Sequence, residues 1–265
     1  PAAVPAFLIG LPRSGTTLVG DRLARHPTLG LAIETPAIER AVAFCEKRTG
    51  QPYPECAFAL DAAGAEEARA LVRQVWRERV GPASAGARVL LDQHPLNAER
   101  VAMVAALFPE APILRLVRDP RDVALSRFLQ DFNLSGGTAL FVDLMESAEA
   151  IGRMQGVMAG LLALVSNPVT PIRFEDLVEA PGEALSAALA ALGLEMAPEV
   201  LEQAGDGPPA APRTASYAQV AEPINRRGVA RWVRYRAALP QPWLERLGPV
   251  ADAEGYPPDG GVEGG

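Results

Sequence analysis

Lysine is almost absent from this chain of 265 residues, since Lys47 is the only lysine among 25 basic residues and arginine supplies the rest. A nucleoside triphosphate site that relies on a lysine in its phosphate-binding loop is therefore excluded unless Lys47 supplies that group. Arginine suits bidentate recognition of oxyanions. We expect any anion-binding site in this protein to be built from arginine.

Cysteine and histidine are also scarce, with two residues of each. Cys45 and Cys56 are too few for a disulfide framework, and they form neither a CxxC pair nor part of a histidine cluster. We expect two reduced thiols and no metal site. The longest apolar helical stretch, residues 156–165, is too short to span a bilayer, and no basic-then-apolar leader opens the chain. These features predict a cytoplasmic protein that has no membrane segment.

The chain lacks an excess of positive charge. Its net charge is −7 and its isoelectric point is about 5.1, which argues against sequence-independent binding to nucleic acid. Hydrophobic residues make up 49% and charged residues 22%, as in ordinary globular proteins, so a wholly disordered chain is excluded.

Short apolar runs alternate with helical patterns along the sequence. We expect buried strands at 6–9, 88–91, 112–117 and 170–174 and helices at 16–25, 62–80, 98–107, from 120 onward and at 137–165. This alternation predicts an α/β fold, in which a parallel sheet carries helices on both faces. Without a repeat or a linker, we expect one domain over residues 1–256 and a disordered tail at 257–265. Ligands of such sheets bind beyond the carboxyl ends of the strands.

The first segment that carries chemistry is residues 10–17, GLPRSGTT, between an expected strand and an expected helix. Glycines there let backbone N–H groups converge on an anion at the helix N-terminus. The spacing matches the P-loop pattern GxxxxGK[ST] except that Thr16 replaces the lysine. The loop predicts an anion site with Arg13, Thr16 and Thr17 as side-chain donors; the alternative is an ordinary strand-to-helix turn.

The second segment is residues 116–126, LVRDPRDVALS. A helix start explains Asp119 as the N-cap and Pro120 as the first helical residue. It leaves Arg118 and Arg121 beside the end of the strand unexplained. A second phosphate, held by Arg118 and a hydroxyl from the following helix, is the functional interpretation.

Together these segments resemble the PAPS-dependent sulfotransferases, whose donor is 3′-phosphoadenosine 5′-phosphosulfate. The resemblance runs from about residue 5 to 250 and is carried by the motifs at 11–18 (LPRSGTTL), by Arg118 and Ser126 eight residues apart, and by 173–177 (RFEDL) and 225–232 (NRRGVARW). It is closest to the branch of tyrosylprotein sulfotransferases and bacterial tetratricopeptide-linked sulfotransferases. The resemblance implies a P-loop-like sulfotransferase fold and in-line transfer of a sulfuryl group from PAPS to a hydroxyl or amine, without a metal.

The resemblance also implies the residues that hold the donor. For the 5′-phosphosulfate they are Arg13, Ser14, Gly15, Thr16 and Thr17. For the 3′-phosphate they are Arg118 and Ser126, helped by Arg226, Arg227 and Gly228. Phe174 stands where relatives often have a tyrosine. Ser216, within 214–225, matches a serine that touches the donor phosphate; the alternative is a loop serine that caps the next helix.

Two residues are candidates for the catalytic base, with Arg13 as the charge that stabilises the leaving oxygen. Glu34 aligns with the base of the tyrosylprotein branch; the alternative is a glutamate at a helix start. His94 stands where cytosolic sulfotransferases have a histidine base; the alternative is a structural histidine, and we rank it second. Gln93 replaces a lysine of the bacterial branch, which leads to the hypothesis that Arg13 alone neutralises the departing charge.

The acceptor is not predicted by the sequence. Peptide tyrosine, a saccharide, a lipid, and a small phenol or alcohol all remain open, as does a homodimer. Two other functions stay open beside sulfuryl transfer. One is a P-loop kinase or NTPase, which the missing lysine disfavours. The other is a protein that binds PAPS or its product PAP (adenosine 3′,5′-bisphosphate) without transfer activity.

Overall fold

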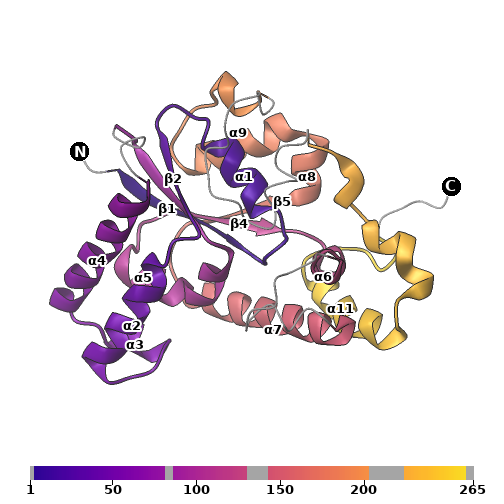
Figure 1. Ribbon diagram of the computed structural model, residues 1–265, viewed down its shortest axis with the longest axis horizontal. Coiled ribbons are helices and arrows are strands. Elements are labelled where there is room, and N and C mark those ends of the chain that lie inside the picture. The colour runs from indigo at the N-terminus through magenta and orange to yellow at the C-terminus, as the bar shows by residue number, and fades with distance from the viewer. Residues whose placement is uncertain (1–2, 81–85, 130–142, 203–223, 261–265) are drawn as a thin grey trace.

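A computed structural model describes residues 3–80, 86–129, 143–202 and 224–260. Their strands form one parallel sheet in the order β2-β3-β1-β4-β5 (Figure 1). The strands are β1 Val4–Gly10, β2 Leu29–Ile33, β3 Val89–Gln93, β4 Ile113–Val117 and β5 Val169–Arg173. The sequence-based prediction of an α/β fold with one parallel sheet is confirmed.

Helices cover both faces of the sheet. One face carries α2 Ala37–Thr49, α3 Glu55–Ala59, α4 Ala62–Val80, α5 Val101–Leu107 and α7 Leu144–Leu162. The other carries α1 Thr16–Leu23, α8 Phe174–Glu179 and α9 Pro181–Ala191. Beyond β4 lie α6 Pro120–Phe128 and α11 Gln241–Ala253. The 3-10 segments are η2 Pro95–Arg100, η4 Pro198–Val200, η5 Arg226–Gly228 and η6 Arg231–Ala238.

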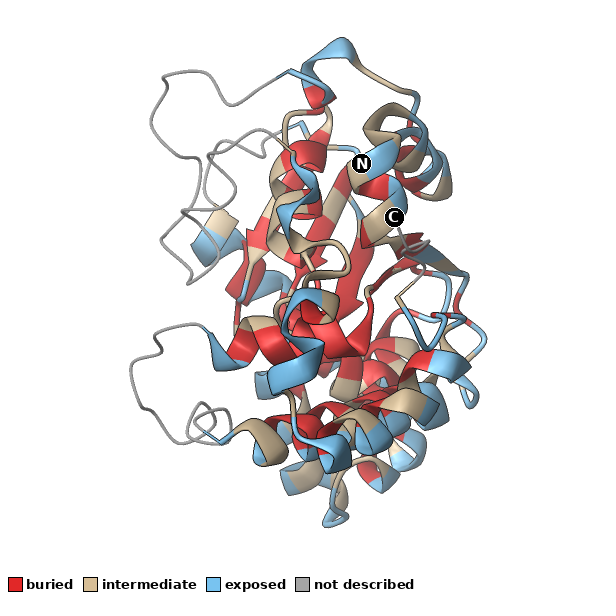
Figure 2. Cartoon of the chain, turned by 90° about the vertical axis from the view of Figure 1, so that its right-hand side faces the viewer, coloured by how far each residue is buried: buried red, intermediate tan, exposed pale blue. Residues whose placement is uncertain are grey.

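The central strand β1 shows why the apolar runs are continuous rather than alternating. Phe7 and Ile9 pack into the core beside α4 and α5, whereas Ala6 and Leu8 pack into the core beside α1 and α9. Both faces of the strand are therefore buried from Ala6 to Gly10, and Figure 2 shows buried residues in red through the centre of the sheet. A third apolar cluster, which contains Trp232 and Trp243, joins α6, α7 and α11.

Several elements differ from the prediction. The edge strand β2 was not predicted, because its sequence LGLAI contains Gly30 and Ala32, which favour strands weakly. The expected helix at 98–107 begins with the 3-10 turn η2. In α7, Asp143 caps the helix by accepting hydrogen bonds from the backbone N–H groups of Met145 and Glu146. Residues 137–142 of the expected helix lie outside the described residues.

The C-terminal segment contacts the body of the sheet domain. Tyr256 is buried against Val117 and donates its hydroxyl to Glu175 at 2.7 Å. The carbonyl oxygens of Pro257 and Pro258, at the start of the expected tail, accept hydrogen bonds from the Arg121 guanidinium at 2.8 Å and 3.3 Å. Residues 257–259 are exposed.

A buried carboxyl group ties three elements to β3. Asp92 accepts hydrogen bonds from Trp76 Nε1 at 2.6 Å, Asn97 Nδ2 at 3.3 Å and Thr35 Oγ1 at 3.4 Å. These donors lie on α4, on η2 and just after β2. Burial raises the pKa of Asp92 to about 7, although the bonds from Trp76 and Thr35 oppose the shift.

The raised pKa of Asp92 predicts how stability depends on pH. The folded state holds this proton more tightly than the unfolded chain, so the stabilisation is present at low pH and is lost as the pH rises from about 4 to about 7. In Asp92→Asn the uncharged amide removes that loss. Its free energy of unfolding relative to the unsubstituted protein should increase by roughly 3–5 kcal/mol between pH 4 and pH 8.

Urea unfolding at a series of pH values measures the difference. Asp252→Asn, at an exposed position on α11, is the matched control and should show no such trend. A difference between Asp92→Asn and the unsubstituted protein that stays constant with pH would contradict the assignment.

Candidate functional site

Several of the residues singled out in the sequence lie at one edge of the sheet. Because all five strands are parallel, their carboxyl ends lie at the same edge. Ile33 pairs with Gln93, so Glu34 and His94 follow neighbouring strands. β1 lies between β3 and β4, so the chain leaves it at a topological switch point, where ligands of such sheets bind.

The loop at 11–15 is a tight turn that depends on Gly15. Ser14 N–H donates to the Leu11 carbonyl at 3.0 Å, and Arg13 and Gly15 have φ angles of 74° and 110°. Glycine adopts this left-handed conformation without strain. A Cβ atom on Gly15 would lie 2.7 Å from Phe174 Cδ2, so glycine is also required for space.

The loop delivers the N-terminus of α1 to the site. Thr16 is the first residue of the helix, and no side chain among the described residues caps its N-terminus. The first backbone N–H groups of a helix have no carbonyl partner within it and attract anions. The Thr16 side chain is buried and the Thr17 side chain is half-buried, so Thr17 has the more accessible hydroxyl.

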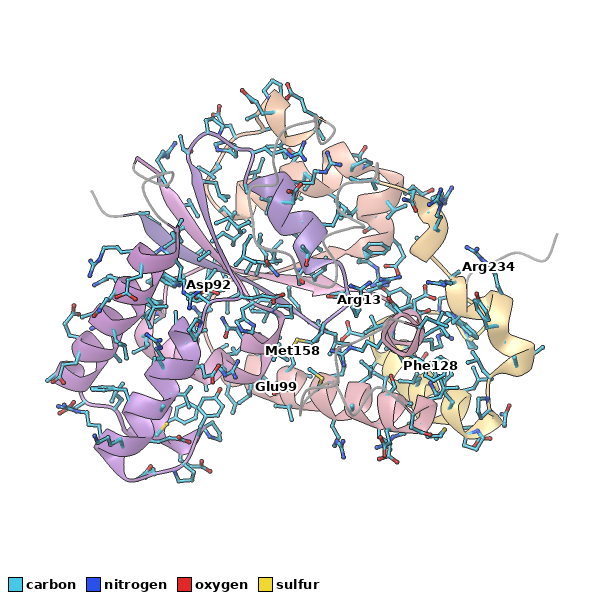
Figure 3. The ribbon with its side chains drawn as sticks, viewed as in Figure 1. Arg13, Asp92, Glu99, Phe128, Met158 and Arg234 are labelled. Carbon is cyan, nitrogen blue, oxygen red and sulfur yellow. The ribbon has the colours of Figure 1, made fainter. Side chains whose placement is uncertain are left out.

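Arg118 joins the two predicted anion-binding segments. Its Nη1 donates to the Arg13 carbonyl and its Nη2 to the Gly228 carbonyl, both at 2.8 Å. The guanidinium carbon lies 4.3 Å from the centre of the Phe174 ring. Arg13 Nε in turn reaches Ser126 Oγ on α6 at 3.5 Å, and Figure 3 shows Arg13 beside that helix. Thus five of the predicted residues form one cluster.

The cluster concentrates positive charge in a partly desolvated place. Burial and the nearby Arg118 lower the pKa of Arg13 to about 10. Burial likewise lowers the pKa of Arg118, although Asp122 and Glu175 oppose the shift. Arg13 remains protonated at neutral pH, so an anion in this cluster would relieve the repulsion between the two guanidinium groups.

Arg121 takes a structural role that separates it from Arg118. It forms a buried ion pair with Asp119 at 2.8 Å and stacks 4.1 Å from the centre of the Trp232 ring. Trp232 Nε1 donates to the same Asp119 carboxylate at 3.1 Å. Arg121 also donates its backbone N–H to the Asp119 carboxylate, and its guanidinium donates to the carbonyl oxygens of Pro257 and Pro258. These bonds hold the C-terminal segment against α6.

The two arginines before Gly228 lie at the surface. Arg226 and Arg227 are exposed in η5, and Arg226 forms an exposed ion pair with Glu179 at 3.4 Å. Asn225 begins this turn by accepting a hydrogen bond from Arg227 N–H at 3.1 Å. The Gly228 carbonyl is the group of this turn that accepts a hydrogen bond from Arg118. Ser216 lies outside the described residues.

A further arginine supports the loop and was not predicted. Arg127 is 1% exposed, donates from Nε to the Pro12 carbonyl at 3.0 Å and contacts Met154 Sδ from Nη1 at 3.8 Å. Burial and the nearby Arg13 lower its pKa to about 9. In the sequence, the position of Arg127 next to Ser126 was the only hint of this role. Helical spacing alone does not show which arginine side chain of α6 points toward the loop.

Desolvation shifts the pKa values of the two base candidates in opposite directions. Glu34 follows β2 with a φ angle of 44°, and its N–H donates to the Gln93 carbonyl at 2.8 Å. Its side chain is exposed, yet partial desolvation raises the pKa of its carboxyl group. Glu34 precedes α2 by three residues, so it is not part of that helix. Burial and the nearby Arg100 lower the pKa of His94 to about 4. Glu34 is thus a stronger base than an ordinary glutamate, whereas His94 is a weaker base than an ordinary histidine.

Gln93 is the last residue of β3 and lies between the two base candidates and α1, the helix that follows the loop. Its side chain is 1% exposed, and a Cβ atom on Gly20 of α1 would lie 3.2 Å from its Cγ. The amide Nε2 is buried without a hydrogen-bond partner in the described part of the chain.

Residues 3–80, 86–129, 143–202 and 224–260 contain no group of three or more His, Cys, Asp or Glu side chains that could hold a metal. Within those same ranges, no helix is long and apolar enough to cross a membrane.

Comparison with known proteins relates this site to a family. The chain is 28% identical over 246 residues to an uncharacterized protein of Aquifex aeolicus, covering 90% of this chain and 32% of that protein. It is 28% identical over 218 residues to nodulation protein NoeE of Sinorhizobium fredii, covering 74% of this chain and 52% of that protein. The chain thus spans about a third of the first relative and about half of the second. It is 24% identical over 265 residues to protein-tyrosine sulfotransferase 2 of Gallus gallus, covering 95% and 69%.

Solved structures agree on the fold. The sulfotransferase domain from the curacin biosynthetic pathway superposes with a TM-score of 0.62 at 22% identity, covering 97% of this chain and 99% of that one. The sulfotransferase domain of the Synechococcus PCC 7002 olefin synthase gives a TM-score of 0.60 at 21% identity, covering 97% and 96%. A sequence model of the Sulfotransferase family matches residues 5–198, which include the loop, both base candidates, Arg118, Ser126 and Phe174. With its fold and most of its length in agreement, the chain belongs to the sulfotransferase family.

Proposed function

We propose that this protein transfers a sulfuryl group from PAPS to a hydroxyl or amine acceptor by in-line displacement. The observation that carries the proposal is the position of Arg118, which contacts the loop at Arg13 and the η5 turn at Gly228. Two anion-binding places are thereby held next to each other by arginine, in a chain whose loop has no lysine. A donor with a 5′-phosphosulfate and a separate 3′-phosphate matches that arrangement.

In this proposal the first anion-binding place holds the 5′-phosphosulfate. The backbone N–H groups at the start of α1 and the side chains of Arg13 and Thr17 would bind it. The second place holds the 3′-phosphate between Arg118 and Ser126, and the exposed Arg226 and Arg227 would add positive charge nearby. Phe174 supports the Arg118 guanidinium by stacking but offers no hydroxyl to the donor.

In the transfer step, every proton, bond and charge is assigned to the acceptor, the donor or a residue of the protein, without a metal ion. Glu34 accepts the proton of the acceptor O–H or N–H group as the acceptor atom forms a bond to sulfur. The bond between sulfur and the bridging oxygen of the 5′-phosphate breaks, and PAP leaves with the negative charge. Arg13 stabilises that charge, so the work of the protein is positioning, proton removal and charge stabilisation.

Binding of PAP is the first test of the proposal. Calorimetric titration should give micromolar affinity for PAP and much weaker affinity for AMP, because AMP lacks the 3′-phosphate. Arg118→Ala should weaken PAP binding by about a hundredfold, since it removes charge-assisted hydrogen bonds to that phosphate. Arg153→Ala, at an exposed position on α7, is the matched control and should leave the affinity unchanged.

The comparison ligands decide between the alternatives. Equal affinity for PAP and AMP would overturn the assignment of the 3′-phosphate site. Preference for ATP with Mg²⁺ over PAP would favour a P-loop kinase or NTPase. Binding of PAP without turnover in an acceptor screen would favour a PAP- or PAPS-binding protein.

The base assignment predicts a difference between two substitutions. Glu34→Gln should lower kcat by about 10²–10⁴-fold, because the amide cannot take the acceptor proton. His94→Gln should lower kcat far less, because the low pKa of His94 makes it a poor proton acceptor. Both variants should retain PAP binding. A greater loss of kcat in His94→Gln than in Glu34→Gln would reverse the assignment.

Replacement of Gln93 by lysine is predicted to raise kcat, an uncommon result for a substitution in an active site. If Arg13 alone stabilises the leaving oxygen, Gln93→Lys adds a second positive charge at the end of β3 and should raise kcat. Gln93→Met, which has similar length and no charge, should not raise it. Unchanged or lower turnover in Gln93→Lys would count against the idea that Arg13 acts alone.

A further inference from the structure

A small polar cavity lies beneath the loop at 11–15. It offers about 10 Å³ to the centre of a water molecule, which is space for one. The polar side chains that line it are those of Ser14, Arg115, Arg118, Gln155 and Glu254, and the apolar lining is Leu11, Leu116, Val117 and Pro120. The lining therefore comes from the loop, from β4 and its end, from α6, from α7 and from the end of α11.

Three polar atoms on residues of this lining are buried without a hydrogen-bond partner in the described part of the chain. They are Ser14 Oγ, Arg115 Nε and Arg118 Nε. The Ser14 side chain is 1% exposed and lines the cavity, so its hydroxyl is buried beneath the loop. Leaving a buried donor or acceptor unsatisfied costs on the order of 1–3 kcal/mol, so three around one cavity indicate a shared partner.

Glu254 supplies a fixed negative charge at the same cavity. Arg115 Nη2 and Gln155 Nε2 both donate to its Oε1, which leaves the second carboxylate oxygen unused by these bonds. Arg173 donates to the Glu254 backbone carbonyl at 2.9 Å and 3.0 Å. These bonds hold the end of α11 against β4, β5 and α7.

We propose that one water molecule occupies this cavity and that, through it, Glu254 is a positioning residue for the donor site. The hydrogen-bonding groups match the capacity of a single water. The water accepts from Arg115 Nε–H and Arg118 Nε–H, and it donates to Ser14 Oγ and to the Glu254 carboxylate. All three unsatisfied atoms then gain a partner.

The water fixes the two anion-binding places from below. Nη1 and Nη2 of Arg118 bond to the Arg13 and Gly228 carbonyls, and the water would hold the third nitrogen and so the plane of the guanidinium. Through Ser14 it also fixes the middle of the loop. The role of Glu254 in donor binding rests on the proposed function, whereas the water itself does not.

A double-mutant cycle tests the bridge. Ser14→Ala and Glu254→Gln each remove one partner of the water, and no direct hydrogen bond joins the two residues among those described. Each single variant should weaken PAP binding about three- to tenfold, and the double variant should bind no more weakly than the worse single variant. Asp252→Asn removes an exposed carboxylate two residues earlier on α11 and should leave the affinity unchanged.

The same cycle, measured on the free energy of unfolding in the absence of PAP, should show the same non-additivity. A high-resolution crystal structure of the unsubstituted protein should contain a water bonded to Ser14, Arg118 and Glu254. Effects of the two substitutions that simply multiply, or a crystal structure in which a side chain fills the cavity, would overturn the inference. If the unsubstituted protein does not bind PAP, the proposed function fails, while the unfolding cycle and the crystal structure still decide on the water.

Discussion

The hydrogen bonds of Arg118 to two carbonyl groups are the interaction on which the site depends. They join a loop that follows the first strand to a turn more than 200 residues later, and neither partner carries a charge. Backbone carbonyls fix the plane of the guanidinium without neutralising it. Asp122 and Glu175 raise the pKa of Arg118 from nearby, but neither forms an ion pair with it among the described residues, whereas Arg121 is ion-paired with Asp119.

The packing of the C-terminal segment makes that arrangement possible. Asp119 caps α6, pairs with Arg121 and accepts a hydrogen bond from Trp232, so one carboxylate links the helix start to the segment that follows η5. Trp232 N–H also donates to Asp122 at 2.8 Å. These buried bonds hold Trp232, four residues after Gly228, against the start of α6. The position of Arg118 is thus a consequence of packing on both sides of β4.

The scarcity of lysine has a physical counterpart in the structure. Arg13, Arg118 and Arg127 crowd around the loop, and burial lowers the pKa of each. A lysine under the same desolvation would start from a lower pKa and lose its charge more readily. Arginine keeps the site cationic and also holds the loop by bonds to carbonyl oxygens, as Arg127 does at Pro12.

Local sequence was enough to predict the four strands with strong apolar runs, the tight loop at 11–15 and the start of α6 after Asp119, because neighbouring residues fix these features. The resemblance to the sulfotransferases singled out Arg118 and Ser126, which are eight residues apart. Contacts between distant segments were needed to show that the weakly patterned β2 joins the sheet and that Arg121 is structural. They were also needed to show that Arg127 supports the loop and that the Ser14 hydroxyl faces inward. Each of these features depends on which distant segment buries or pairs with the residue, and the neighbouring residues in the sequence do not specify that segment.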